Sequence, residues 1–180
     1  LAFVPLLSGG SLVFSPIHII FLELICDPTS VLGFEREKAR HNLMDEPPRS
    51  VKEPLIDAGM WGKIIIRGLV ITLVAVSFYY FGLQQGGLPL GRTLSYASLI
   101  ISQVFLIIFT RELSQVKSNW LLAIISVLTF VILNIILFVP AAREVFKFVP
   151  ISFNHYLYIV AVPLVAMAVV SFFTKKIKIF

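Results

Sequence analysis

The sequence predicts an all-α protein: a polytopic transmembrane helical bundle with about five full spans, plus the end of a preceding helix. Of its 180 residues, 58% are hydrophobic and only 14% are charged, and the mean hydropathy is +0.93. A soluble domain of this length is usually about 45–50% apolar and about 25% charged. A buried core alone does not explain the excess, so we expect a bilayer to surround most of the chain.

Five apolar stretches are long enough to form the ~20-residue helices that cross a membrane. They cover residues 12–34, 63–83, 94–110, 120–139 and 153–174, and residues 60–180 therefore form a predicted four-span C-terminal bundle. Residues 1–8 resemble the end of a preceding helix, which indicates a piece of a longer protein. Turn-forming residues separate the spans, among them QQGGLPLG at 84–91 and Val139-Pro140.

The distribution of basic residues predicts the orientation in the membrane. Most of the 15 lysines and arginines lie in segments 35–59, 111–119 and 175–180, whereas the opposite side has only Arg92, Arg143 and Lys147. Cytoplasmic loops carry the excess of positive charge in membrane proteins. We therefore expect a cytoplasmic loop at 35–59 and a cytoplasmic C-terminus. The net charge of +5 then indicates topology and not a nucleic-acid partner.

The first full span contains two carboxylates, Glu23 and Asp27, followed by Pro28. A carboxylate at mid-bilayer costs at least ~2.5–3.5 kcal/mol, so two of them need compensation. Residues four apart lie on one face of a helix. Pro28 has no N–H group, so the carbonyl of Leu24 loses its helical partner. The two acids and the freed backbone form an oxygen-rich site suited to Ca²⁺ or another hard cation, and broken helices recur at ion sites in transporters.

The two acids also have roles that need no bound metal ion. They can pair with basic residues of neighbouring helices, or stay protonated, either as structural hydrogen-bond donors or as carriers of counter-transported protons. Cys26 lies beside Asp27 and is a weak candidate ligand, because soft sulfur suits hard cations poorly. A small packing residue is the more usual role for such a cysteine.

Four further residues are expected to have structural roles. We expect His18 to be an interfacial hydrogen-bonding residue and not a metal ligand, and Tyr96 to anchor its helix end among lipid headgroups. Arg67 is expected to extend toward the headgroups. Asn134 lies deep in a span and is expected to make an interhelical hydrogen bond.

Two sequence motifs resemble a known family. SPIHIIFLELICD at 15–27 is similar to the sixth transmembrane helix of type II P-type cation-transporting ATPases, the group that includes the calcium pumps. LMDEPPRSVKEPLI at 43–56 is similar to the cytoplasmic link that follows it, and the pattern is formed by Met44, Pro47, Pro48, Arg49, Glu53, Leu55 and Ile56. The resemblance covers essentially the whole chain. It implies the sixth to tenth helices of such a pump, with residues 1–8 as the end of the fifth.

The resemblance also implies a set of ion ligands. Glu23 and Asp27 match two ion-binding positions, and SQVF at 102–105 places Gln103 at a further, weaker one. Independently, Gln103 is a polar residue in an apolar helical turn, so it either bonds across helices or faces the ion. Calcium pumps typically have Asn at the position of Glu23, a hydroxyl at Cys26 and Gly at Pro28. The site is therefore more acidic and differently shaped here, and a bacterial branch is similar to this ELICDP form.

The implied function is that of the ion-translocation region of an ATP-driven pump, with Ca²⁺ the first candidate cation, in a bacterial plasma membrane. ATP and Mg²⁺ are expected only in cytoplasmic domains elsewhere in the protein, because the sequence has no Asp-Lys-Thr-Gly motif and no phosphate-binding loop. The chain alone is then not catalytic, and its partners are membrane lipids and the N-terminal remainder of the pump.

Two other functions use the same residues differently. An ion-coupled secondary transporter or channel module would use the acids without ATP, although inverted repeats typical of such proteins are not evident in the sequence. A structural scaffold accounts for residues 60–180, but it does not explain Glu23 and Asp27.

Overall fold

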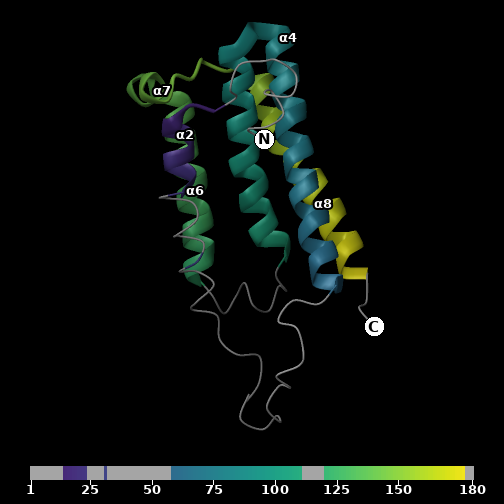
Figure 1. The fold of residues 1–180 in the computed structure, drawn as a ribbon. Coiled ribbons are helices and arrows are strands. Elements are labelled where there is room, and N and C mark those ends of the chain that lie inside the picture. The colour runs from purple at the N-terminus through teal and green to yellow at the C-terminus, as the bar shows by residue number, and fades with distance from the viewer. Residues whose placement is uncertain (1–13, 24–30, 32–57, 111–119, 177–180) are drawn as a thin grey trace.

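The computed structural model describes residues 14–23, 31, 58–110 and 120–176. Five helices lie in these ranges: α2 (Pro16–Phe21), α4 (Ala58–Thr110), α6 (Trp120–Phe138), α7 (Pro140–Phe146) and α8 (Phe153–Lys176). Figure 1 shows the long helices standing side by side, with the short α7 across one end. No strand occurs in the described ranges, and the predicted all-α fold is confirmed.

Helix α4 is a helical hairpin. Gly86 (φ −150°, ψ 19°) and Gly87 (φ 71°, ψ −164°) leave helical geometry, and the two arms run antiparallel from this point (Figure 1). The backbone conformation of Gly87 is open essentially to glycine alone. At 1.5 Å per residue the arms, residues 58–85 and 88–110, are about 42 Å and about 35 Å long. Each arm is long enough to cross the ~30 Å hydrocarbon core, and the reversal lies within the predicted connector 84–91.

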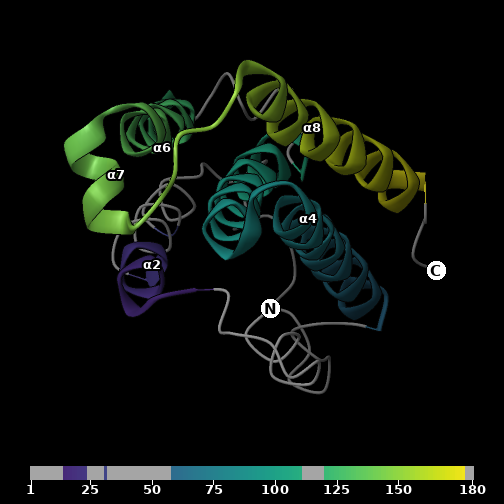
Figure 2. The same ribbon diagram turned by 90° about the horizontal axis from the view of Figure 1, so that it is seen from above.

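Helix α8 packs along the α4 hairpin (Figure 2), and polar contacts join the two at both ends. At one end, His155 Nε2 donates to Gln85 Oε1 at 2.8 Å. At the other end, Arg67 Nη2 donates to Thr174 Oγ1 at 3.0 Å. Arg67 is half-buried, and the expectation that it extends to the headgroups stays a prediction. It lies beside the last turns of α8, which supply its partner.

Helix α6 is joined to α8 by the predicted interhelical hydrogen bond of Asn134. The hydroxyl of Tyr156 donates to Asn134 Oδ1 at 2.8 Å. Helix α6 ends before Val139, and α7 then leaves at an angle of 92°. Val139 is extended and Pro140 occupies the first turn of α7, because a residue before proline is disfavoured in the α conformation.

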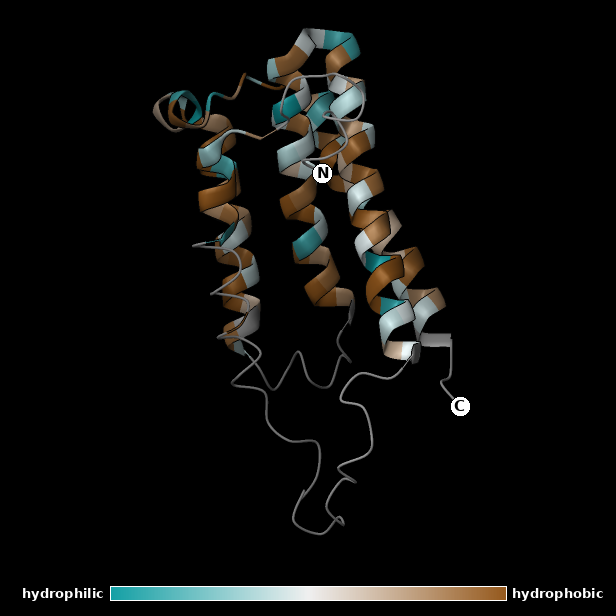
Figure 3. Cartoon of the chain, in the orientation of Figure 1, coloured by the Kyte–Doolittle hydropathy of each residue, from teal (hydrophilic) through white to brown (hydrophobic). Residues whose placement is uncertain are grey.

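The outer surface of the described helices is apolar. Figure 3 shows hydrophobic residues along most of their length, and the exposed large side chains include Ile64, Leu69 and Leu73 on α4, Val127, Leu128 and Val131 on α6, and Leu157, Val165 and Phe172 on α8. Exposed apolar surface of this extent is typical of a membrane-facing surface.

Two of the described helices have the length and hydropathy of membrane spans. They cover Gly59–Phe109 and Phe153–Thr174, with mean hydropathies of 2.0 and 2.3, and the bent pair Ala123–Phe138 and Pro140–Phe146 is a third candidate. Because α4 folds back at Gly87, its hydrophobic length corresponds to two passes. Together with the apolar outer surface, these helices indicate an integral membrane protein.

Candidate functional site

The structure describes two of the four predicted ion-site residues. Glu23 follows α2 directly, and its side chain is exposed. Gln103 is half-buried on the second arm of α4. Asp27 and Cys26 lie outside the described residues, as does Pro28. The four-residue pairing of Glu23 with Asp27 therefore stays a prediction.

The chain remains helical beyond the end of α2, as far as Glu23. Residues Pro16–Phe21 are α-helical, whereas Leu22 and Glu23 are π-helical. Such single wide turns inside helices are rare and are frequent at functional sites. Leu22 keeps α-region backbone angles (φ −62°, ψ −50°), and the residues between Glu23 and the predicted break at Pro28 lie outside the described part of the chain.

His18 links α2 to the end of α7. The N–H of Ser15 donates to Nδ1 of His18 at 2.9 Å, so Nδ1 is an acceptor and Nε2 carries the proton. Nε2 then donates to the carbonyl oxygen of Phe146 at 2.8 Å, across 128 residues of sequence. His18 is fully buried, and both of its ring nitrogens have partners, as buried polar atoms require.

Aromatic rings enclose His18 on several sides. Phe148 stacks on it in parallel, with ring centroids 4.8 Å apart and an interplanar angle of 6°, and Tyr96 lies tilted at 4.9 Å. The rings of Phe14 and Phe146 are both 6.1 Å away. The hydroxyl of Tyr96 also donates to the carbonyl oxygen of His18 at 3.3 Å.

These contacts correct two sequence-based expectations. His18 makes hydrogen bonds as expected. Both His18 and Tyr96 were expected at the lipid interface, however, and both side chains are fully buried inside the protein. The cause is the chain after α7, where Phe146 and Phe148 pack against α2. No local pattern around His18 or Tyr96 signals contacts with residues so distant in the sequence. The one available signal was the concentration of aromatic residues at 146–148.

Glu23 and Gln103 lie at a similar depth along their helices. Helix α2 and the second arm of α4 run in the same direction (Figure 1), and they meet where Tyr96 contacts His18. Gln103 is seven residues beyond Tyr96, on the same helix face, and about 10 Å further along the axis. Glu23 is five residues beyond His18, or about 7.5 Å.

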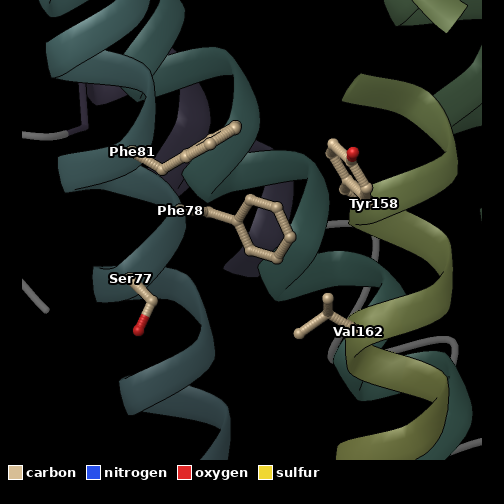
Figure 4. A pocket seen from close by; sticks show the side chains of 5 residues that line it. All are labelled: Ser77, Phe78, Phe81, Tyr158 and Val162. Carbon is tan, nitrogen blue, oxygen red and sulfur yellow. The ribbon is translucent and has the colours of Figure 1, made fainter. Parts of the chain in front are cut away.

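Within the described ranges, no three His, Cys, Asp or Glu side chains come together as a metal site. A groove with a volume of about 460 Å³ lies between the first arm of α4 and α8, and its lining is mostly apolar (Figure 4). It is lined by Ser77, Phe78, Phe81, Tyr158 and Val162. The hydroxyl of Ser77 donates to the carbonyl of Leu73, so the lining lacks the several oxygen ligands that a hard cation requires.

Comparison with known proteins establishes the family. Residues 11–176 match the family described as "Cation transporting ATPase, C-terminus". The chain belongs to this family of transmembrane pump regions, as the motifs at 15–27 and 43–56 predicted.

Several calcium-transporting ATPases are similar to the chain. Calcium-transporting ATPase 1 of Lactococcus lactis is 26% identical over 165 residues, which are 87% of this chain and 18% of that protein. A calcium-transporting ATPase of Listeria monocytogenes is 26% identical over 163 residues, with the same coverage of 87% and 18%. Calcium-transporting ATPase 5, plasma membrane-type, of Oryza sativa is 32% identical over 80 residues, 43% of this chain and 7% of that protein. The chain thus spans 18% of the length of the two bacterial relatives.

Proposed function

We propose that the chain is the ion-translocating transmembrane region of an ATP-driven calcium pump. One observation carries the proposal: in a chain of the cation-transporting ATPase family, an exposed carboxylate, Glu23, lies at a π-helical turn inside an apolar span. An ionisable residue inside a membrane span marks an ion or proton pathway by default. Relatives over 87% of this chain are named as calcium-transporting, which supports Ca²⁺ as the cation.

The proposed site combines carboxylate and neutral oxygens. Glu23 and Asp27 supply the charge, and the backbone loosened at Pro28 supplies carbonyl oxygens. Gln103 adds an amide oxygen from the second arm of α4, and its depth matches that of Glu23. Cys26 is at most a weak ligand. Because Ca²⁺ takes 6–8 oxygens at about 2.3–2.6 Å, neighbouring helices of the full-length protein complete the shell.

In this proposal, α4, α6 and α8 form a scaffold beside the ion-site helix. ATP and Mg²⁺ bind in cytoplasmic domains of the full-length protein, and phosphorylation there changes the side and affinity of the site. The partners of this region are membrane lipids and the rest of the same pump. The excess of Lys and Arg at 35–59 and 175–180 supports a cytoplasmic C-terminus, and the bacterial relatives support a bacterial plasma membrane.

Phosphoenzyme formation tests this function. The full-length protein in native membranes is incubated with labelled ATP and, in turn, Ca²⁺, Mn²⁺, Mg²⁺, Na⁺ or K⁺, beside the variants Glu23→Gln and Asp27→Asn. We expect Ca²⁺ to switch on an acid-stable phosphoenzyme. Each variant should need at least about tenfold more Ca²⁺, because ligand charge strongly sets calcium affinity.

Glu144→Gln is the matched control, because Glu144 is an exposed carboxylate on α7 and lies outside the proposed site. It should leave the calcium dependence unchanged. If no ion produces a phosphoenzyme, and an imposed ion gradient drives transport without ATP, the chain belongs to a secondary transporter and the pump proposal is wrong.

A further inference from the structure

We propose that His18 is a positioning residue for the ion site. It fastens α2 to the end of α7 and to the segment that follows α7, and so sets where the backbone lies five residues before Glu23. This inference rests on the proposed function above. It adds a residue that acts on the ion site through the backbone of α2 and does not itself contact the ion.

Three separate elements hold α2 at His18. The end of α7 accepts the Nε2 hydrogen bond at the carbonyl of Phe146. The second arm of α4 contributes the Tyr96 hydroxyl, which donates to the His18 carbonyl. The segment after α7 contributes the ring of Phe148, stacked at 4.8 Å. The outer part of α2 is therefore built into the scaffold of α4 and α7.

Two buried side chains hold α2 shortly before Glu23. Phe21 packs edge-on against Phe146, with ring centroids 5.5 Å apart, and His18 makes the buried polar contacts. Glu23 follows His18 by five residues, and its side chain is exposed. The position of the Glu23 carboxylate therefore depends on where the backbone of α2 is held, and the nearest buried polar contact that holds it is at His18.

Histidine meets the chemical requirements of this position. Its ring accepts a hydrogen bond from the Ser15 N–H at Nδ1 and donates one at Nε2, while its flat face stacks on Phe148. Phenylalanine keeps the flat ring but makes neither hydrogen bond. Glutamine can donate and accept but does not stack in the same way. The two substitutions therefore separate hydrogen bonding from packing.

The test measures calcium affinity and maximal phosphorylation separately. In the full-length protein in membranes, phosphoenzyme formation from ATP is titrated with Ca²⁺ for wild type, His18→Phe, His18→Gln and Tyr96→Phe. We expect His18→Phe to raise the half-maximal Ca²⁺ concentration about tenfold, as loss of a residue that orients metal ligands does. The maximal phosphoenzyme per folded protein should stay near that of wild type. His18→Gln should restore part of the affinity, and Tyr96→Phe should shift it in the same direction by a smaller factor.

His155→Phe is the matched control. His155 is also a histidine with a ring hydrogen bond and an aromatic neighbour, but its partners are Gln85 and Phe81, away from α2. It should leave the half-maximal Ca²⁺ concentration unchanged.

Two results overturn the inference alone. In the first, the wild type shows calcium-dependent phosphorylation, and the His18 and Tyr96 variants have the same half-maximal Ca²⁺ concentration as the wild type. The other is a lower maximal phosphoenzyme at unshifted affinity, which indicates a purely structural role. If His18→Phe does not fold, the Ca²⁺ titration of Tyr96→Phe tests the inference instead, because this variant removes one hydroxyl and keeps the ring. A wild type without calcium-dependent phosphorylation overturns the proposed function itself, and this inference with it.

Discussion

Gly82 and Gly91 bring the two arms of α4 into backbone contact beside the turn. A Cβ atom on Gly82 would lie 2.6 Å from the Cα of Gly91, and a Cβ atom on Gly91 would lie 2.8 Å from the carbonyl oxygen of Tyr79. Small residues permit such close approach between membrane helices. The hairpin therefore depends on glycine at these two positions, in addition to the conformation of Gly87.

Substitution of Gly82 should therefore separate the arms. We expect Gly82→Ala to lower the free energy of unfolding by about 1–3 kcal/mol, because the added methyl group meets backbone atoms that cannot move aside. Thermal unfolding of the detergent-solubilised full-length protein measures the change. Gly68→Ala is the control, because a Cβ there has no neighbour within 4 Å; it should be neutral or slightly stabilising. Equal losses for both variants would show that the close contact is not the cause.

The hydrogen bond between Tyr156 and Asn134 should contribute to the packing of α8 on α6. Tyr156→Phe removes the donor and leaves Asn134 Oδ1 half-buried, so we expect a loss of about 0.5–1 kcal/mol in stability. Tyr158→Phe serves as the comparison, because that ring is 48% exposed and should change stability little. The same unfolding assay compares them, and a neutral Tyr156→Phe would indicate that water or another group replaces the bond.

Lys147 ends α7 in the left-handed conformation, with φ 53° and ψ 39°. A side chain there costs about 1–2 kcal/mol relative to glycine, partly offset by the greater chain entropy of unfolded glycine. We expect Lys147→Gly to raise the unfolding free energy by about 0.5–1 kcal/mol. Lys147→Ala keeps the Cβ atom and should give no such gain. A gain from Lys147→Ala equal to that from Lys147→Gly would attribute the effect to the charge and not to the backbone.

Local sequence patterns were sufficient to predict the long helices, but not the short α7 (Pro140–Phe146). Hydropathy located the apolar ranges that correspond to both arms of α4, to α6 and to α8, because a long apolar run has few alternatives to a membrane helix. The Gly86-Gly87 pair predicted the reversal, since only glycine adopts the conformation found at Gly87. Asn134 was predicted to bond across helices because an amide within an apolar span needs a partner.

Contacts between distant residues were not predictable in this way. His18 and Tyr96 are buried by the segment around Phe146 and Phe148, and Arg67 is half-buried beside Thr174. Each case depends on how two helices meet, and the periodicity of either helix does not contain that information. Position along a span predicted an interfacial location for His18 and Tyr96, whereas packing placed these two side chains between helices.

The candidate ion site stays a prediction that rests on residue chemistry and on the family resemblance. Glu23 was selected because an acid in an apolar span is costly unless it has a partner or a function. Gln103 was selected because of the SQVF resemblance. The π-helical turn at Glu23 had no signal of its own in the sequence.

Equilibrium binding of labelled Ca²⁺ tests the central claim most directly. The full-length protein, purified in detergent with lipid and without ATP, is compared with Glu23→Gln and with Glu144→Gln, which makes the same change of charge on α7. The account predicts saturable binding by the wild type and by Glu144→Gln, with affinity at least about tenfold weaker in Glu23→Gln. Equal affinity in all three proteins would contradict the assignment of Glu23 as a ligand of the transported ion.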